Sequence, residues 1–222
     1  MARLARIVVP HIAHHVTQRG NRRQQVFFSA DDSLAYIEYL HEGLTRTKTT
    51  CLAWCLMPNH VHLILVPTAE DGLRAALGEA HRRYSRRVNF REGWRGYLWQ
   101  GRFASYPMDE AHVRNAILYV ERNPVAAGLA ARAEDWRWSS ARARVAGTDD
   151  PLADLDAVDM RGLDWSRELA GWDAEQEEGG AHDMDAHLRT GRPLGDENFV
   201  ARLEAATGRT LAKRKRGPKP AG

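Results

Sequence analysis

Residues 57–65 have the sequence MPNHVHLIL, in which His60 and His62 flank one hydrophobic residue. Alternate side chains of a β-strand point to the same face, so we expect both imidazole rings on one face of a strand. The neighbouring hydrophobic residues would anchor the opposite face in a core; they are Val61, Leu63 and Leu65. Two imidazoles fixed on a strand supply two ligands of a divalent metal site. The alternative interpretation is a strand that simply exposes one polar face to water.

A second segment, AHVRNAILYVERNP at residues 111–124, predicts a helix that Pro124 is expected to end. Tyr119 and Asn123 are four residues apart, so they share one helical face. Facing the two histidines, they would bring a nucleophilic hydroxyl and a third oxygen ligand to the same ion. Taken alone, a tyrosine on a helix more often packs in a core.

Further motifs accompany these two segments along the chain. They are HVTQRGNRRQ at 15–24, CLMPNHVHLIL at 55–65, HRRYSRRVN at 81–89, GWRGYLWQGRF at 93–103, NPVAAGL at 123–129 and DWRWSS at 135–140. With these motifs in this order, the chain resembles the REP-associated tyrosine transposases, a group of the IS200-like, single-tyrosine HUH transposases. The resemblance extends from about Val16 to Ser140.

The resemblance implies roles for four residues. His60 and His62 match the metal-binding histidines of the family, and Tyr119 matches the nucleophile of its YxxxNP helix. Asn123 falls at the position of the third metal ligand, where many relatives have glutamine. The implied cofactor is a divalent metal ion, Mg²⁺ or Mn²⁺.

The resemblance also implies a reaction, which is cleavage and rejoining of single-stranded DNA beside hairpin-forming palindromes through a 5′-phosphotyrosine intermediate. The alternative is a catalytically idle protein that binds hairpin DNA as a regulatory or architectural factor. A replication or conjugation initiator would share the chemistry, but the sequence has no GxxxxGK[ST] phosphate loop, which favours the small transposase type. We expect a cytoplasmic protein that acts as a monomer or a homodimer.

Charge is distributed unevenly along the chain, although the formal net charge is only +3. Residues 1–148 carry a net charge of +8, residues 149–185 carry −11 and residues 186–222 carry +6. Basic regions fit a polyanionic partner, because neutralised phosphates release counterions. We therefore expect a catalytic domain at 1–148, a partly ordered acidic linker at 149–186 and a basic segment at 187–222 with auxiliary DNA contacts. The acidic segment would alternatively fold over the basic groove as a phosphate mimic.

Arginine clusters follow the first expected strand and occupy one expected helix. The guanidinium fork suits phosphate oxygens, so these side chains are expected to contact DNA. They are Arg19, Arg22 and Arg23, then Arg82, Arg83, Arg86 and Arg87, and finally Arg102. The four helical arginines fit an ordinary solvated helix face equally well. Trp94, Tyr97 and Trp99 would offer stacking surfaces to unpaired bases, although core packing is the expected use, above all for Trp99.

The pattern of the remaining chain predicts strands at 12–19, 50–57, 60–66 and about 102–108, and helices at 30–46, 72–90 and 196–207. A tight hairpin interleaved with helices predicts an α+β fold, with an antiparallel sheet and helices packed on one side, of ferredoxin or RRM type. The resemblance implies the same HUH fold with a C-terminal extension. No apolar run approaches the roughly 20 residues of a membrane span. Cys51 and Cys55 are expected to be reduced core residues.

Overall fold

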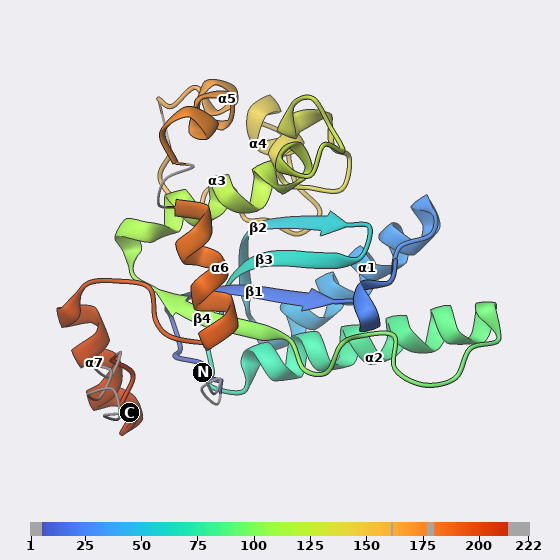
Figure 1. Ribbon diagram of the computed structural model, residues 1–222, viewed down its shortest axis with the longest axis horizontal. Coiled ribbons are helices and arrows are strands. Elements are labelled where there is room, and N and C mark those ends of the chain that lie inside the picture. The colour runs from blue at the N-terminus through green and yellow to red at the C-terminus, as the bar shows by residue number, and fades with distance from the viewer. Residues whose placement is uncertain (1–5, 161, 177–179, 213–222) are drawn as a thin grey trace, which may run out of the picture.

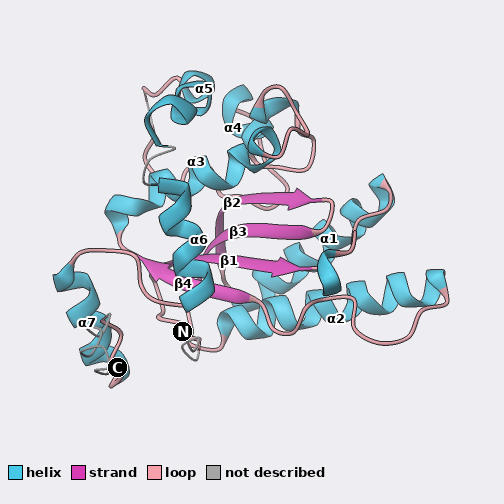
Figure 2. Ribbon diagram, in the orientation of Figure 1, coloured by secondary structure: helices cyan, strands magenta, loops and turns pink. Residues whose placement is uncertain are grey.

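The computed structural model describes residues 6–160, 162–176 and 180–212. Its centre is a four-stranded antiparallel sheet in the order β2-β3-β1-β4 (Figure 2). The strands are β1 (Ala13–Arg19), β2 (Thr50–Met57), β3 (His60–Val66) and β4 (Ala104–Met108). All four predicted strands are therefore present, and β2 and β3 form the predicted hairpin around Pro58 and Asn59.

Two long helices, α1 (Ala30–Thr47) and α2 (Gly72–Glu92), pack on one face of the sheet. Val61, Leu63 and Leu65 of β3 are fully buried in the core that these helices form with the sheet. Because side chains alternate along a strand, the two histidines of β3 point to the opposite face. The predicted division of this strand into a hydrophobic and a histidine face is confirmed.

The opposite face carries α3 (Glu110–Ala126), together with α5 (Trp165–Gln176) and α6 (Gly180–Thr190). In Figure 1, α3 lies beside β2, and α6 crosses in front of the strands. The predicted α+β class with an antiparallel sheet is confirmed, but helices cover both faces rather than one. The reason is that this face is also apolar beyond the histidines, where Ile64 and Tyr106 are fully buried against the added helices.

The sequence predicted that helix α3 would end at Pro124, but the helix continues to Ala126. Proline has no N–H, so the carbonyl four residues earlier loses its helical donor. The amides that follow continue the bonding, because N of Ala127 donates to the carbonyl of Asn123 at 3.0 Å and N of Leu129 donates to that of Pro124 at 2.8 Å. The last turn of the helix therefore tolerates the proline.

The acidic segment contributes α5, which contacts α3 through Glu121. Nε1 of Trp165 donates to the buried carboxylate of Glu121 at 2.6 Å, and Nε of Arg144 donates to the same carboxylate at 3.0 Å. Oγ of Ser140 adds a third hydrogen bond to it at 2.7 Å. Part of the acidic segment is thus tied to the core, while the centre of its EQEEGG run, residues 177–179, lies outside the described residues.

The remaining elements are short or peripheral. They are the 3-10 turns η1 (Asn21–Arg23) and η2 (Ala133–Asp135), and the helices α4 (Ala141–Ala146) and α7 (Glu197–Thr207). The helix predicted at 196–207 is confirmed as α7, and the basic run from Lys213 onward lies outside the described residues. Cys51 and Cys55 are free and buried, as predicted. In the part of the chain that is described, no helix has the length and apolar character that crossing a membrane requires.

Candidate active site

Residues from β1, β3, α3 and α6 line a cavity of about 750 Å³. His60 and His62 reach it from β3, and Tyr119 and Asn123 reach it from α3. The ring centroids of His60 and His62 are 4.9 Å apart, and the ring of Tyr119 lies edge-on to that of His62 at 5.6 Å. The fold thus brings together the four residues that the sequence proposes as metal ligands and nucleophile.

Both histidine rings are held through Nδ1. Nδ1 of His60 donates to Oδ1 of Asn59 at 2.6 Å, and a hydrogen bond of 2.9 Å joins Nδ1 of His62 to Nε2 of His15. A metal-ligating histidine typically uses its second nitrogen in this way, which fixes the tautomer and the ring orientation. The arrangement leaves Nε2 of each ring as the atom available to a ligand.

His15 was not identified from the sequence. It is fully buried, and its Nδ1 is hydrogen-bonded to the hydroxyl of Tyr106 at 3.1 Å. With Nδ1 of His62 donating to His15, Nδ1 of His15 is protonated and donates to Tyr106, so one chain of hydrogen bonds sets both tautomers. The signal in the sequence was the alternation of His15, Thr17 and Arg19 along a strand, which becomes informative only when β1 is known to pair with β3.

The histidines of the site are neutral near pH 7. Burial, with a smaller contribution from the charge of Arg19, lowers the pKa of His60 to about 3. Burial also holds the pKa of His62 well below its usual range, and the nearby His60 and His15 lower it further. A neutral imidazole is the form that binds metal, so the site needs no deprotonation before binding.

Tyr119 and Asn123 occupy successive turns of α3, and Nδ2 of Asn123 donates to the carbonyl of Tyr119 at 2.8 Å. The amide therefore retains Oδ1 as its acceptor. The ring of Tyr119 lies 5.5 Å from that of His15 and 6.3 Å from that of Trp172 on α5. The nucleophile candidate is consequently packed between the histidine layer of the sheet and the helix of the acidic segment.

Three of the predicted DNA-contact residues line the cavity; they are Arg19, Arg23 and Arg102. Arg22 is exposed on the same 3-10 turn as Arg23. Arg22 and Arg23 both have left-handed backbone angles, with φ of 53° and 61° respectively. Such angles are costly for side chains with a Cβ and persist where surrounding contacts impose them. Here Asn59 supplies one, because its Nδ2 donates to the carbonyl of Arg23 at 3.0 Å.

The other four predicted arginines lie on α2, which covers the other face of the sheet. Arg82 pairs with Glu79 at 2.6 Å, and Arg83 pairs with Glu42 of α1. Arg86 and Arg87 are exposed and form no ion pair within the described part of the chain. None of the four lines the cavity, so the structure does not bring them together with the histidines.

The cavity also includes residues that the sequence did not indicate. Gln100 precedes β4, and Leu188 and Arg189 lie at the C-terminal end of α6. Nothing in the pattern of α6 pointed to this position, because its docking depends on contacts with β1, β4 and α3 rather than on local sequence.

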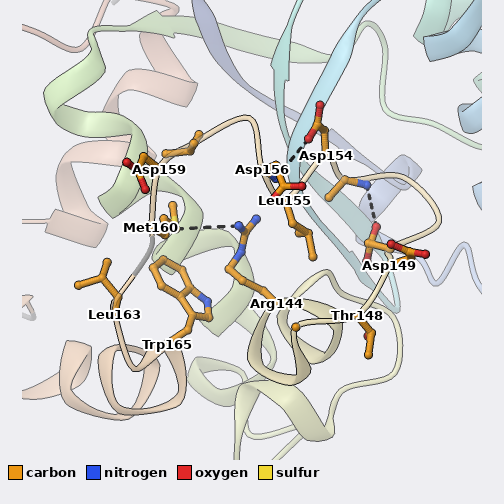
Figure 3. Close-up of a pocket in the computed structure, with 14 residues that line it drawn as sticks. Arg144, Thr148, Asp149, Asp154, Leu155, Asp156, Asp159, Met160, Leu163 and Trp165 are labelled. Carbon is orange, nitrogen blue, oxygen red and sulfur yellow. Dashed lines mark hydrogen bonds between the residues drawn. The ribbon is translucent and has the colours of Figure 1, made fainter.

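A second cavity, of about 790 Å³, lies against the acidic segment (Figure 3). Arg144 and Trp165 line it together with aspartates that include Asp149, Asp154 and Asp159. Carboxylates repel phosphate groups, so this cavity is electrostatically unsuited to DNA. The histidine cavity, which four arginines line, is the one that fits a polyanion.

An α+β fold in which a His-x-His strand of an antiparallel sheet faces a tyrosine-bearing helix defines the HUH class of fold. The chain belongs to the family described as transposase IS200 like, whose model matches residues 8–123. That range includes both histidines and Tyr119.

The chain is also similar to two other proteins. A REP-associated tyrosine transposase of Haemophilus influenzae is 26% identical over 129 residues, which make up 50% of this chain and 73% of that protein. The solved structure of a REP-associated tyrosine transposase bound to a REP hairpin matches with a TM-score of 0.56 and 21% identity. That match covers 72% of this chain and 96% of the other, and confirms the predicted fold. The resemblance drawn from the sequence is confirmed.

Proposed function

We propose that this protein cleaves and rejoins single-stranded DNA beside hairpin-forming sequences, through a 5′-phosphotyrosine intermediate and with a divalent metal ion. The observation that carries the proposal is the convergence of His60, His62 and Tyr119 in one cavity that four arginines also line. Family membership supports the DNA-processing chemistry. A hairpin substrate is favoured because the similar solved transposase is bound to a REP hairpin.

The residues of the site fit a divalent metal ion. His60 and His62 are adjacent and neutral, and each is held through Nδ1 so that Nε2 is the ligand atom. Within the described residues, no cluster of three or more His, Cys, Asp or Glu side chains is placed to hold a metal. We therefore assign the third protein ligand to the amide oxygen of Asn123. A bound Mg²⁺ or Mn²⁺ would polarise the scissile phosphate. Of these two ions, imidazole ligands bind Mn²⁺ more tightly than Mg²⁺.

In the proposed reaction, the hydroxyl of Tyr119 loses its proton and its oxygen attacks the scissile phosphorus. The bond from phosphorus to the 3′ oxygen breaks, so Tyr119 keeps the 5′-phosphate, and the other strand end takes up a proton to become a 3′-hydroxyl. Attack by a second 3′-hydroxyl on the phosphotyrosine reverses the step and joins the strands. The intermediate conserves the phosphodiester bond energy, so rejoining needs no nucleotide triphosphate.

The arginines would act on the phosphate rather than on the bases. Arg19 and Arg102 line the same cavity as the histidines, and a guanidinium stabilises the charge that develops on phosphate oxygens during the attack. Neutral histidines would not add to this positive charge, so charge stabilisation would depend on the arginines and the bound metal.

The test is to incubate labelled single-stranded palindromic DNA from around the encoding gene with the protein and Mg²⁺ or Mn²⁺, and to search denaturing gels for a covalent adduct. Wild-type protein should form the adduct, and Tyr119→Phe should not. Tyr39→Phe is the matched control, because Tyr39 packs under Arg83 outside the cavity. If Tyr119→Phe and wild type bind hairpins equally and neither forms an adduct with either metal, the DNA-binding regulatory protein replaces this proposal.

A further inference from the structure

Four large aromatic side chains lie on the surface where α2 ends and the following loop begins. The exposed fractions are 90% for Phe90, 88% for Tyr97, 42% for Trp94 and 39% for Phe28. We call these four residues the aromatic surface. Single exposed apolar residues are common, but a group of exposed aromatic rings marks a site of interaction.

The motif GWRGYLWQGRF contains aromatic residues of two kinds, one buried in the core and one exposed on the surface. Trp99 is buried in the core with Phe27, Tyr36 and Tyr84, as expected from the sequence. Tyr97 faces solvent, so core packing does not account for it.

The aromatic surface is surrounded by positive charge. Phe90 and Trp94 line a shallow hollow of about 450 Å³ together with Arg86 and Arg95. Neither arginine has an acidic partner among the described residues, whereas nearby Arg91 is paired with Asp32 and with Glu92. Aromatic rings beside unneutralised guanidinium groups match the two components of single-stranded nucleic acid, which are bases that stack and phosphates that carry charge.

The loop that carries Trp94 and Tyr97 leads directly to the histidine cavity. It pairs with the end of β1, because N of Asn21 donates to the carbonyl of Leu98 at 2.8 Å and N of Gln100 donates to that of Arg19 at 2.8 Å. Gln100 already lines the cavity. Gln100 lies three positions after Tyr97, which limits the distance between their Cα atoms to about 11 Å, or about three nucleotides at 3.4 Å each.

Internal contacts hold the loop in place. Nδ2 of Asn89 donates to the carbonyl of Gly96 at 2.9 Å, and N of Trp94 donates to the carbonyl of Asn89 at 2.9 Å. The rings of Phe28 and Trp94 meet edge-on at 5.8 Å. A surface held in this way loses little conformational entropy when a flexible strand binds to it.

We propose that the aromatic surface binds the unpaired nucleotides flanking the hairpin, by stacking bases on Phe90 and Tyr97 while Arg86 and Arg95 contact their phosphates. The inference rests on the proposed function for the identity of the strand, and it adds a binding site outside the cavity. Stacking tolerates any base, so this surface would contribute affinity and position the strand rather than select its sequence.

The experiment compares the binding of two oligonucleotides, a hairpin with a single-stranded flank and the same hairpin with a blunt end. Phe90→Ala and Tyr97→Ala should each weaken binding of the flanked hairpin about 5- to 150-fold and leave the blunt hairpin unchanged. Tyr97→Phe should retain affinity, and Tyr97→Leu should lose it, since only an aromatic ring stacks on a base. Leu163→Ala is the control, because it removes an exposed apolar side chain from the acidic segment.

Equal affinity of Phe90→Ala and wild type for the flanked hairpin would overturn the inference, and so would an equal loss for both hairpins. A concentration-dependent dimer of the wild type that Phe90→Ala abolishes, with unchanged DNA affinity, would assign the surface to a second copy of the chain instead. The adduct assay with Tyr119→Phe is independent of these results. A flank-specific loss of affinity in a protein that forms no adduct would therefore support this surface while refuting the proposed function.

Discussion

Replacing His15 with alanine should weaken metal binding by His60 and His62 and slow adduct formation. Nδ1 of His62 lies 2.9 Å from Nε2 of His15, and both side chains are buried, so water has little access to replace the lost partner. A buried donor left without its partner costs about 1–3 kcal/mol. The ring of His62 would then be free to rotate or to change tautomer. Loss of such a supporting group typically lowers metal affinity or activity about 10- to 100-fold.

The assay is a calorimetric titration of the protein with Mn²⁺, with adduct formation as a second measurement. His14→Ala is the matched control, because His14 is also fully buried but points to the other face of β1 and hydrogen-bonds to the carbonyl of Ile12 at 2.7 Å. Both variants lose a buried ring, and both should lower the free energy of unfolding. Only His15→Ala should lose Mn²⁺ affinity, and equal affinities of His15→Ala and wild type would refute the reasoning.

Three further predictions concern charge. Arg102→Ala should reduce the slope of log affinity against log salt concentration by about one, whereas Arg82→Ala should change it less because Arg82 pairs with Glu79; equal slopes in filter-binding titrations would contradict this. Glu121→Gln should lower the free energy of unfolding in urea by about 3–5 kcal/mol, since it leaves Arg144 buried without its counter-charge, and a loss below about 1 kcal/mol would argue against that role. The metal-free protein should become less stable as pH falls from 6.5 toward 5, by up to about 1.4 kcal/mol per pH unit for each buried histidine. Burial lowers the folded-state pKa to about 4 for His14 and about 3 for His15, His60 and His81, so below pH 6.5 the unfolded chain binds protons that the folded chain does not. Urea unfolding with no pH dependence in that window would contradict the assignment of neutral buried rings.

Local periodicity was sufficient to predict the elements that carry the site. The alternation in MPNHVHLIL places the histidines on one face of β3, and the four-residue spacing of Tyr119 and Asn123 places both on one face of α3. Both predictions depend only on the geometry of a single strand or helix. Bringing the two faces together required tertiary packing, and for that the sequence argument depended on the family resemblance.

The features that the sequence did not predict depend on partners distant in the chain. His15 meets His62 across 47 residues, and Arg83 meets Glu42 across 41. Such pairs follow from strand order and helix packing, which local patterns do not encode. The same reason explains why the arginines of α2 were ambiguous, since Arg82 and Arg83 bind acidic side chains and Arg86 borders the aromatic surface.

Helix α3 connects the site to the acidic segment. Tyr119 and Asn123 face the cavity. Glu121 and Arg122, which lie between them, contact α5 instead. Glu121 accepts from Trp165, and Arg122 donates to the carbonyl of Leu169, so the segment with the most negative charge supports the helix that carries the proposed nucleophile. Aspartates of its first part, which include Asp149, Asp154 and Asp159, line the second cavity with Arg144. Among the described residues, none of this segment lines the cavity proposed to bind phosphate, so the segment can support the position of Tyr119 from outside that cavity.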